Sequence, residues 1–464
     1  MAFIGREKEQ EELKSFLKSD SQEAALIYGR RRIGKTELIV HCIKDVPFKK
    51  VYFQCLESTQ QQNCEELSVI VSRAFGLPVI QFSTITDILN FIFSAAEKEK
   101  IVLILDEYPY LRNCVKGCDS ILQSFLDRYR SSSHLKLIIC GSYMTVMKSL
   151  TDYENPLYGR FNIKIKLEQM DYLDTAEFYP SFPEDDKVKL YSIFGGIPYY
   201  NSLVSEKMSV SENMIHLLLA DHAPLKDEVP LYLQKEINKA ENANSVFNAI
   251  AAGKTKFKDI FVSSGLNSDA ALNNLLTKLS DIEVIRKDYP INAPTDRKKA
   301  NYRISDRLTL FYYTYIFRNV SALNLMNPEI FYQNMIQSNF ESQFVPHAFE
   351  EICRQFLIRY NKAGLINPPL EALGKYYYNN PKTKTNGEFD IVSKDQNGYT
   401  YYEVKYKNTR VSDAIIDAEI QQVHLSPLQA YRYGFFSRSG YSLKENHPEC
   451  IFYTLDDIYR SDQS

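Results

Sequence analysis

The sequence predicts an α/β protein that starts with a parallel sheet and a helical lid and continues into a winged helix and a small second α/β domain. Short apolar runs at residues 24–28, 101–105 and 135–140 have the length and composition of strands buried on both faces of a parallel sheet. A helical pattern interrupted by Gly and Pro extends over residues 170–236, and strand patterns return at 388–392. A chain of 464 residues is long enough for about three separate cores.

Composition and charge exclude several classes of protein. Hydrophobic residues make up 44% and charged residues 24% of the chain, which indicates a globular rather than a disordered protein. The charged start at residues 1–9 is unlike a secretory signal, and no apolar run is long enough to span a membrane, so we expect a cytoplasmic protein. The eight cysteines lack paired metal-site spacing and are interpreted as free thiols. A net charge of −3 means that any nucleic-acid surface must be local.

The strongest local signal is a match to the phosphate-loop pattern GxxxxGK[ST], placed between a strand pattern and a helical pattern. Backbone N–H groups and a helix N-terminus attract phosphate in such a loop. Lys35 is expected to reach the β- and γ-phosphates of ATP, and Thr36 to bind Mg²⁺. The side chains of Arg30, Arg31 and Arg32, which lie within the loop, are expected to face outward. The predicted ATP-binding residues are Gly29, Arg30, Arg31, Arg32, Ile33, Gly34, Lys35 and Thr36.

Two further strand ends carry polar residues that fit the same chemistry. The run 101–105 ends at Asp106 and Glu107, which we interpret as the magnesium-binding acid and as the residue that orients or deprotonates water. An apolar strand meeting solvent at two acids is the plain alternative. Ser142, after the third strand, is a candidate sensor of the γ-phosphate, in the manner of ATPases with an extra strand between the phosphate-loop and acid-bearing strands. Its alternative role is to cap a helix that starts at Met144.

A turn-rich segment at residues 155–160 ends in a single arginine. Arg160 is a candidate for stabilising transition-state charge on the γ-phosphate, as arginine fingers do. A surface ion pair is the alternative, and such pairs contribute little to stability. Residue types alone do not distinguish these two roles.

Together these motifs resemble a prokaryotic AAA-type/STAND-related P-loop ATPase family with an appended nuclease-like domain. The resemblance spans the N-terminal half and implies an ATPase core, with residues 3–7 near the nucleotide base and residues 195–200 in a helical lid. The matching segments are Phe3–Glu7, Gly29–Thr36, Leu105–Glu107, Gly141–Ser142, Leu157–Arg160 and Gly195–Tyr200.

The middle of the chain has the element order of a winged helix-turn-helix. Three helical patterns at 245–252, 256–263 and 269–280 precede two strand patterns at 282–287 and 300–304. Such a module binds DNA or docks a protein, and both roles stay open.

Local charge bears on that choice. Residues 253–310 hold eleven Lys and Arg and seven Asp and Glu, a balance of +4. Three of these cations, Arg297, Lys298 and Lys299, lie at the predicted wing tip. This modest basic patch makes double-stranded DNA a candidate partner.

The C-terminal third contains a predicted hairpin with charged residues. Asp390 lies on its first strand, and Glu403 and Lys405 lie two residues apart on the second, so these two share a face. This pattern resembles the restriction-endonuclease-like PD-(D/E)xK core, in which two carboxylates bind Mg²⁺ and the lysine positions water. The resemblance assigns Glu350 as the helical acid, while Phe389 departs from the motif's proline. A hairpin with solvated charges is the alternative.

These patterns predict an ATPase core at 1–168, a lid at 169–236, a winged helix at 237–310 and a nuclease-like domain at 311–464. The leading hypothesis is an ATP-hydrolysing protein that couples nucleotide state to DNA binding and a nuclease-like domain. The alternative is a slow signalling switch that acts through a protein partner, and a third hypothesis is a nucleotide-binding scaffold without turnover. An oligomer is compatible with all three.

Overall fold

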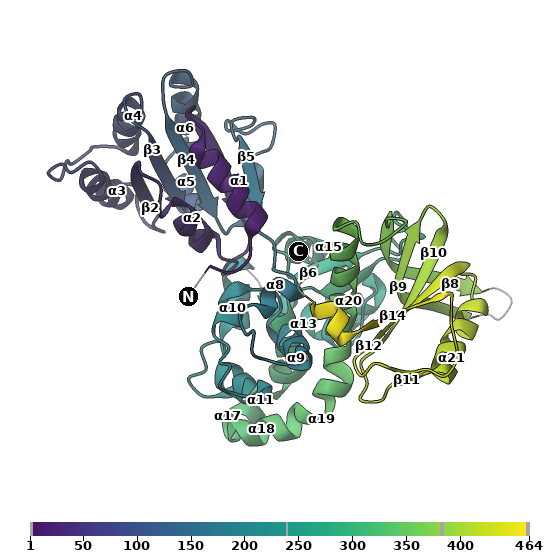
Figure 1. Ribbon diagram of the computed structural model, residues 1–464. Coiled ribbons are helices and arrows are strands. Elements are labelled where there is room, and N and C mark those ends of the chain that lie inside the picture. The colour runs from purple at the N-terminus through teal and green to yellow at the C-terminus, as the bar shows by residue number, and fades with distance from the viewer. Residues whose placement is uncertain (1–2, 238–239, 381–384, 461–464) are drawn as a thin grey trace. The chain divides into compact units, whose positions relative to one another are not determined.

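The computed structural model describes residues 3–237, 240–380 and 385–460, and the chain divides into two compact units, Met1–Gln169 and Met170–Ser464 (Figure 1). The first division lies next to the predicted boundary at residue 168. The predicted lid, winged helix and C-terminal domain all belong to the second unit.

The first unit alternates helices and strands. Its helices are α1 (Glu7–Lys18), α2 (Lys35–Ile43), α3 (Gln60–Ala74), α4 (Ile85–Ala95), α5 (Tyr108–Cys114), α6 (Cys118–Arg128) and α7 (Met144–Ser149). Its strands are β1 (Glu23–Tyr28), β2 (Lys49–Gln54), β3 (Ile101–Asp106), β4 (Leu135–Gly141) and β5 (Ile163–Lys166).

These five strands form one parallel sheet in the order β2-β3-β4-β1-β5. Strands β3 and β4 are buried along their whole length, as their continuous apolar sequences predict. Strand β4 lies between β1 and β3, so three carboxyl ends meet at one sheet edge: the start of the phosphate loop, the acids at 106–107 and Ser142. The predicted α/β fold with an extra central strand is therefore confirmed.

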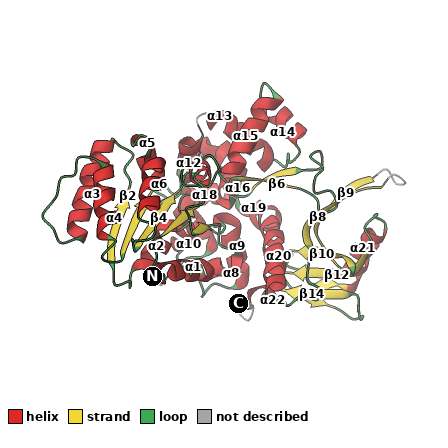
Figure 2. Ribbon diagram, turned by 90° about the horizontal axis from the view of Figure 1, so that it is seen from above, coloured by secondary structure: helices red, strands yellow, loops and turns green. Residues whose placement is uncertain are grey.

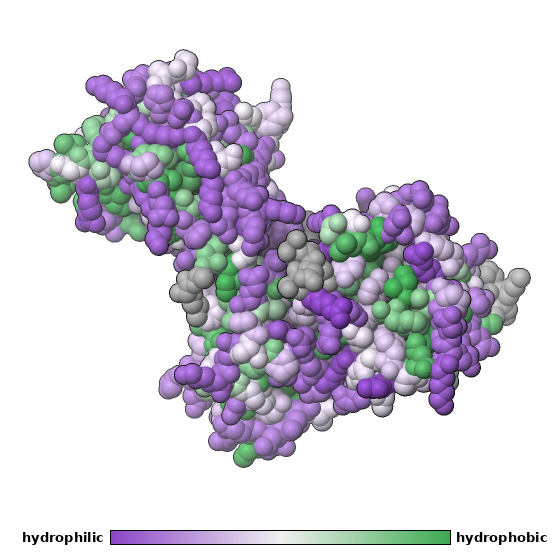
Figure 3. Space-filling model, in the orientation of Figure 1, coloured by the Kyte–Doolittle hydropathy of each residue, from purple (hydrophilic) through white to green (hydrophobic). Residues whose placement is uncertain are grey.

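The core of the first unit lies between this sheet and helices α3, α4 and α6. Leu103, Ile92 and Leu122 are fully buried there, and Phe93 stacks on Phe125 with ring centroids 5.2 Å apart. Burying each such side chain stabilises the fold by roughly 1.5–3 kcal/mol. Hydrophobic residues also lie at the surface of the first unit in Figure 3. In the connection between α3 and α4, Val79 is 63% exposed.

The second unit begins with short helices at the place of the predicted lid. They are α8 (Tyr172–Ala176), α9 (Glu184–Phe194), α10 (Pro198–Ser202), α11 (Val210–Met214), the π-helical turn η1 (Ile215–Leu219) and α12 (Glu228–Glu236). Helix α9 is followed by Gly195, and Pro198 begins α10. The glycine and proline in this segment therefore mark the boundary between two helices, as the sequence predicts.

Three helices and a hairpin follow in winged-helix order. They are α13 (Ala240–Ala251), α14 (Phe257–Ser264), α15 (Asp269–Asp281), β6 (Ile285–Asp288) and β7 (Asn301–Ile304), with β6 and β7 antiparallel. Gly265 ends α14 in the left-handed conformation, with φ of 66°, and Ser268 caps α15. The predicted elements of this region are confirmed.

A run of helices then leads to the last sheet. These are α16 (Arg307–Phe311), η2 (Tyr312–Ile316), η3 (Phe317–Asn319), α17 (Val320–Leu325), α18 (Pro328–Met335), α19 (Gln337–Asn339), η4 (Phe340–Phe344) and α20 (Val345–Lys362). The aromatic run at 311–317 is largely buried: the Tyr313 ring stacks on Phe247 at 4.9 Å. It therefore serves the core rather than a base-stacking surface.

The C-terminal sheet has the order β14-β12-β10-β9-β8. Its elements are β8 (Ala372–Asn380), β9 (Thr385–Asp395), β10 (Gly398–Lys405), β11 (Val411–Ser412), α21 (Asp413–His424), β12 (Ala430–Ser437), β13 (Tyr441–Ser442), β14 (Cys450–Thr454) and α22 (Leu455–Tyr459). Strands β8, β9 and β10 are antiparallel, whereas β10, β12 and β14 are parallel.

Two helices cover opposite faces of this sheet (Figure 2). Phe356 on α20 packs against Phe436 at 5.8 Å, and Ile416 on α21 belongs to the same cluster as Phe435. Adjacent residues of a strand point to opposite faces, so the sheet is buried on both sides. None of the helices in the described part of the chain is both long enough and apolar enough to cross a membrane.

Candidate functional site

The phosphate loop joins β1 to α2 in the first unit. Gly29 approaches the backbone so closely that an added Cβ would lie 2.5 Å from the Leu167 carbonyl oxygen, and Gly34 has a left-handed φ of 91°. Both positions therefore require glycine. Lys35 is 6% exposed, and its Nζ donates to the carbonyl oxygens of Gly29 and Arg30, each at 3.0 Å. The ammonium group is thus held inside the loop that it would share with a polyphosphate.

Asp106 lies across from this loop at the end of β3. Thr36 Oγ1 donates to Asp106 Oδ2 at 2.8 Å, and the Glu107 amide donates to Asp106 Oδ1 at 2.9 Å. The carboxylate is 2% exposed and accepts only from neutral donors in these contacts, so its negative charge is not cancelled by them. A hydroxyl and a carboxylate oxygen are the ligands that Mg²⁺ prefers, and these two residues fit that ion.

Tyr52 is a residue of this site that the sequence interpretation missed. Its hydroxyl donates to the same Asp106 Oδ2 at 2.5 Å from strand β2. Burial raises the pKa of Tyr52 well above its usual value, and the nearby Asp106 raises it further, so the hydroxyl stays protonated and remains a donor. Nothing in the segment around Tyr52 marks it, because the contact depends on β2 lying beside β3.

Glu107 and Ser142 are brought together at the ends of β3 and β4. The Ser142 amide and hydroxyl both donate to Glu107 Oε2, at 3.1 Å and 3.0 Å. Glu107 itself has a left-handed φ of 50°, an uncommon conformation for a residue with a side chain. Ser142 thus contacts the acid and does not cap α7. The N-cap position of α7 is occupied by Tyr143, which makes no side-chain capping hydrogen bond.

The structure corrects one expectation for the arginines of this unit and shows which of two alternatives Arg160 adopts. Arg30 is only 3% exposed and does not face outward, although Arg31 does. Arg160 pairs with Asp127 through Nε at 3.0 Å and Nη2 at 2.8 Å. It lies near the start of β1, because the neighbouring Asn162 amide donates to the Ala24 carbonyl.

The position of Arg160 rules out a finger role toward the loop of the same chain. The loop follows the opposite end of β1, beyond Tyr28, and four residues of strand span roughly 13 Å. The start and the end of a parallel strand lie at opposite edges of the sheet. Arg160 therefore forms the surface ion pair with Asp127 rather than a contact with the phosphate loop.

The segment at residues 3–7 lies beside the loop. The Phe3 ring stacks on His41 of α2 at 4.5 Å. Arg6 donates to the carbonyl oxygens of Ile33 at 3.4 Å and Glu168 at 2.6 Å. These contacts place the segment next to the nucleotide-site helix, where the family resemblance puts it.

In the second unit, the predicted ExK pair lies on β10. Lys405 Nζ is 2.7 Å from Glu403 Oε1 and 2.6 Å from Glu419 Oε1, and the Tyr401 hydroxyl donates to Glu403. Burial raises the pKa of Glu403, while burial lowers and the two acids raise the pKa of Lys405, with a net rise. Glu419 comes from α21 and belongs to no motif, so the sequence interpretation missed it.

Asp390 lies on β9 next to this group. The register pairs Ile391 with Tyr402, so Asp390 and Glu403 are the next positions across the two strands and share a face. Lys375 of β8 binds Asp390 Oδ1 at 2.6 Å and Glu388 Oε1 at 2.8 Å. The structure therefore brings Asp390 and Glu403 side by side, with each carboxylate already paired to a lysine.

Glu350 reaches this region from α20 with His347 beside it. The two side chains lie 3.7 Å apart, and this contact raises the pKa of His347. Asp390 also raises the pKa of His347, and helix α20 packs against β9. Within the described residues, Glu350, Asp390 and Glu403 do not gather their carboxylate oxygens into one tight group.

The predicted wing is the loop between β6 and β7, residues 289–300, and it is hydrogen-bonded to strand β8 within the second unit. The Ile291 amide donates to the Lys375 carbonyl at 2.8 Å, and Asn292 exchanges two hydrogen bonds with Tyr377 of the edge strand β8. Lys299 Nζ lies 5.1 Å from the centre of the Tyr377 ring. Of the three cations at the predicted wing tip, Lys299 therefore contacts β8, whereas Arg297 and Lys298 are exposed.

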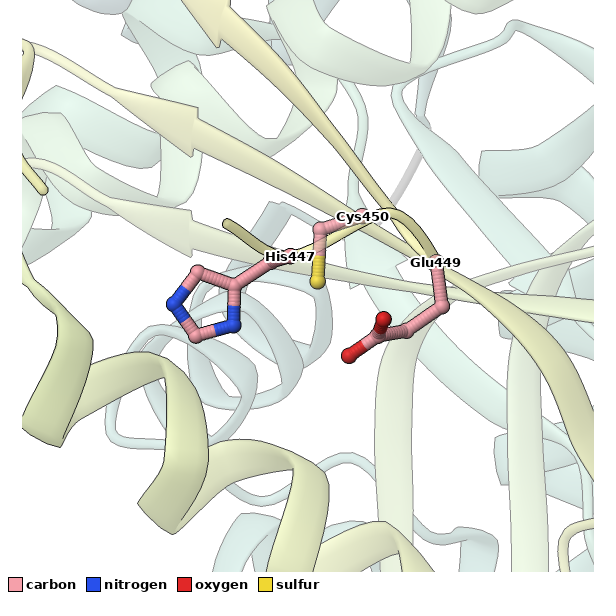
Figure 4. Close-up of side chains that lie close together, drawn as sticks. All are labelled: His447, Glu449 and Cys450. Atoms are coloured by element: carbon pink, nitrogen blue, oxygen red, sulfur yellow. The ribbon is translucent and has the colours of Figure 1, made fainter. Parts of the chain in front are cut away.

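One cluster of metal-type ligands that the sequence interpretation did not identify lies at the start of β14. His447, Glu449 and Cys450 bring one ligand atom each within 4.8 Å of one another (Figure 4). His447 Nε2 is already 3.0 Å from Asp413, which also accepts from two backbone amides of the loop. Burial raises the pKa of Cys450 to about 12. His447 thus fastens this loop to α21.

Comparisons with known proteins bear on both units. Residues 3–204 match the model of an ATPase domain found predominantly in Archaea, and residues 312–416 match a family of archaeal and bacterial proteins of unknown function. The chain is 27% identical over 463 residues to an uncharacterized protein of Methanocaldococcus jannaschii, covering 98% of this chain and 100% of the relative. An uncharacterized ATP-binding protein of that archaeon is 23% identical over 342 residues, which are 62% of this chain and 88% of the relative.

A solved structure gives the same picture of the fold. The Walker-type ATPase of Pyrococcus abyssi aligns with a TM-score of 0.51 and 18% identity, over 67% of this chain and 96% of that one. The family match, the sheet order and the loop geometry together show that the first unit has the fold of a P-loop ATPase domain.

Proposed function

We propose that this chain binds Mg-ATP in its first unit, hydrolyses it, and couples the nucleotide state to a DNA-binding winged helix and a nuclease-like domain in its second unit. One observation carries the ATPase part: hydrogen bonds link Thr36 to Asp106, and Ser142 to Glu107, beside the phosphate loop. Thr36 and Asp106 would hold Mg²⁺, which would offset charge on the phosphates. A relative of the chain is named as ATP-binding, in support.

Glu107 would orient the attacking water, but it can do so only after its hydrogen bonds with Ser142 are broken. A carboxylate that accepts two hydrogen bonds from Ser142 is turned toward the sensor strand. Catalysis requires Glu107 to face water near the γ-phosphate, so Ser142 would have to exchange its acceptor. If Ser142 donates to the γ-phosphate instead, Glu107 is released to bind the attacking water only when ATP is present. The need for this exchange before each reaction favours slow turnover.

The test of hydrolysis compares phosphate release by the full chain and by Glu107→Gln. The variant should lose on the order of 10²–10⁴-fold in turnover rate while it still binds ATP. Lys35→Ala should instead lose ATP binding itself. A scaffold without turnover predicts no difference in phosphate release between the full chain and Glu107→Gln, and that result would reject hydrolysis.

The nuclease-like role rests on Asp390 and Glu403 lying side by side with Lys405 next to them. The two acids would hold a divalent metal ion, and Lys405 would position the attacking water. The test is cleavage of double-stranded DNA with Mg²⁺ or Mn²⁺, which Lys405→Ala should abolish. Lys407→Ala, an exposed lysine two residues on, is the matched control and should cleave normally.

The second candidate function is a slow signalling switch that acts through protein partners, with a non-catalytic C-terminal domain. Two observations favour it: Lys375 already pairs with Asp390, and the wing already bonds to β8. It predicts no cleavage with any metal and no binding of duplex DNA at low salt, where phosphate contacts are strongest. Cleavage lost in Lys405→Ala but kept in Lys407→Ala would decide against it.

A further inference from the structure

A cavity of about 250 Å³ lies within the second unit, where the hairpin β6–β7, helix α20 and strand β8 meet. It is separate from the ExK pair on β10. Its charged lining consists of five cationic side chains and two carboxylates: Arg286, Lys287, Arg303, Arg354, Lys375, Asp288 and Glu351. The cavity is therefore rich in positive charge.

The hairpin itself sets two arginines face to face. Arg286 of β6 lies directly opposite Arg303 of β7 in the antiparallel register. Like charges at directly opposite positions destabilise a strand pair unless an anion lies between them. Arg303 is paired with Asp288 and lies 3.2 Å from Glu351. Arg286 forms no salt bridge with any residue that the structure describes.

The acids of the cavity are outnumbered. Arg354 binds Glu351 at 2.8 Å, so this carboxylate is shared with Arg303. Burial raises the pKa of Glu351, but four guanidinium groups together lower it to about 2; they belong to Arg354, Arg303, Arg307 and Arg286. Two carboxylates, those of Glu351 and Asp288, cannot neutralise four guanidinium groups, so the cluster keeps a surplus of positive charge.

We propose that this cavity binds a phosphate group, with Arg286 and Arg303 as its principal ligands. A planar guanidinium presents paired N–H donors that match phosphate oxygens, and two of them meet here across one hairpin. The volume is below the roughly 300–1,000 Å³ typical of a drug-sized ligand. It is suited to one phosphate with its sugar rather than to a duplex.

Lys375 gives the cavity a route to the nuclease-like site. Its side chain lines the cavity and also binds Asp390 at 2.6 Å. A phosphate that draws the ammonium group toward itself weakens that ion pair and frees Asp390 for a metal ion. This consequence rests on the proposed nuclease-like function, whereas phosphate binding itself does not.

The phosphate can come from a nucleic-acid backbone or from a free nucleotide, and two probes distinguish these sources. Both are measured on the full chain carrying Lys35→Ala, without divalent metal, so that neither the phosphate loop nor cleavage contributes. The first probe is thymidine 5′-monophosphate, followed by calorimetry. The second is a labelled single-stranded octanucleotide without a terminal phosphate, followed by anisotropy.

Arg286→Gln should weaken binding of one probe by roughly tenfold, the effect of losing one charge-assisted hydrogen-bonding group. Arg410→Gln removes an exposed charge from the same unit, outside both the cavity and the predicted winged helix, and should change neither affinity. Loss of mononucleotide binding identifies a free nucleotide, and loss of octanucleotide binding identifies a backbone phosphate. Arg286→Lys keeps the charge without the fork and should bind at an intermediate level.

The melting temperature of each variant distinguishes a loss of binding from a loss of folding. Removing the charge opposite Arg303 should leave the melting temperature of Arg286→Gln equal to or above that of its parent without ligand. The bound probe should raise the melting temperature of the parent only. The proposal fails if neither probe binds the Lys35→Ala chain, or if Arg286→Gln and Arg410→Gln weaken binding equally. Either result leaves the tests of ATP hydrolysis and DNA cleavage untouched.

Discussion

The two acidic sites of this chain use the same residue types but hold them differently. In the first unit, Asp106 accepts from the Thr36 hydroxyl, the Tyr52 hydroxyl and a backbone amide, while Lys35 donates to loop carbonyls. In the second unit, ammonium groups bind the acids directly, as Lys375 does at Asp390. Neutral donors leave a carboxylate's charge available, whereas an ammonium group cancels it. The first site is therefore ready for a cation, and the second must exchange a lysine for one.

The largest test of this contrast replaces one acid in each unit. Asp106→Asn should lower phosphate release by roughly 100-fold or more, because the amide can still accept from Thr36 but lacks the charge that would hold Mg²⁺. Asp390→Asn should leave phosphate release unchanged. The measurement is steady-state release at saturating Mg-ATP. Equal losses in the two variants would show that the sites are not independent.

The ion-pair network of the second unit should be sensitive to acid. Glu351→Gln should lower the free energy of unfolding at pH 7 by about 3 kcal/mol, because two partly buried guanidinium groups lose the carboxylate that they share. The pKa of Glu351 falls from 4.5 to about 2 on folding. Its contribution is therefore full above about pH 4.5 and is lost as pH falls toward 2.

Urea unfolding at pH 7, 5 and 4 measures that difference. The neighbouring Glu350→Gln is the control, since the one ion pair that Glu350 forms with a described residue is its looser contact with His347. A gap between the wild-type chain and Glu351→Gln that stays constant down to the lowest pH at which the chain folds would contradict the assignment.

Removing the competing ammonium group should make the second site more like the first. In an Asp106→Asn background, Lys375→Met should raise the affinity for Mn²⁺ by roughly tenfold, because Asp390 and Glu388 lose their shared cation. Calorimetric titration with Mn²⁺ measures this. Lys362→Met removes an exposed lysine at the end of α20 and should not change the affinity. An unchanged affinity in Lys375→Met would show that the lysine does not guard the site.

The smallest expected effect concerns Tyr52. Tyr52→Phe removes one neutral donor from Asp106 and should slow phosphate release about fivefold, as expected for one lost hydrogen bond. The Mg²⁺ concentration for half-maximal activity should shift as well, since the freed oxygen is a metal ligand. Tyr129→Phe, whose hydroxyl bonds to Ser94 elsewhere in the unit, serves as the control. Identical kinetics in both variants would remove Tyr52 from the site.

The sequence alone determined most of the local structure. The apolar runs before Gly29, Asp106 and Ser142 are the three central strands, and the winged-helix and hairpin elements are close to their predicted bounds. These predictions succeed because strand burial, helix capping and the phosphate loop are encoded within a few consecutive residues.

Long-range packing determines which of those residues come into contact. Tyr52 and Glu419 join their sites from elements with no motif, Arg160 lies at the far sheet edge, and Lys375 pairs with Asp390 across two strands. Strand order and cross-strand register set these contacts, and they depend on packing between segments that are distant in the chain. Residue spacing within a segment carries no information about that packing.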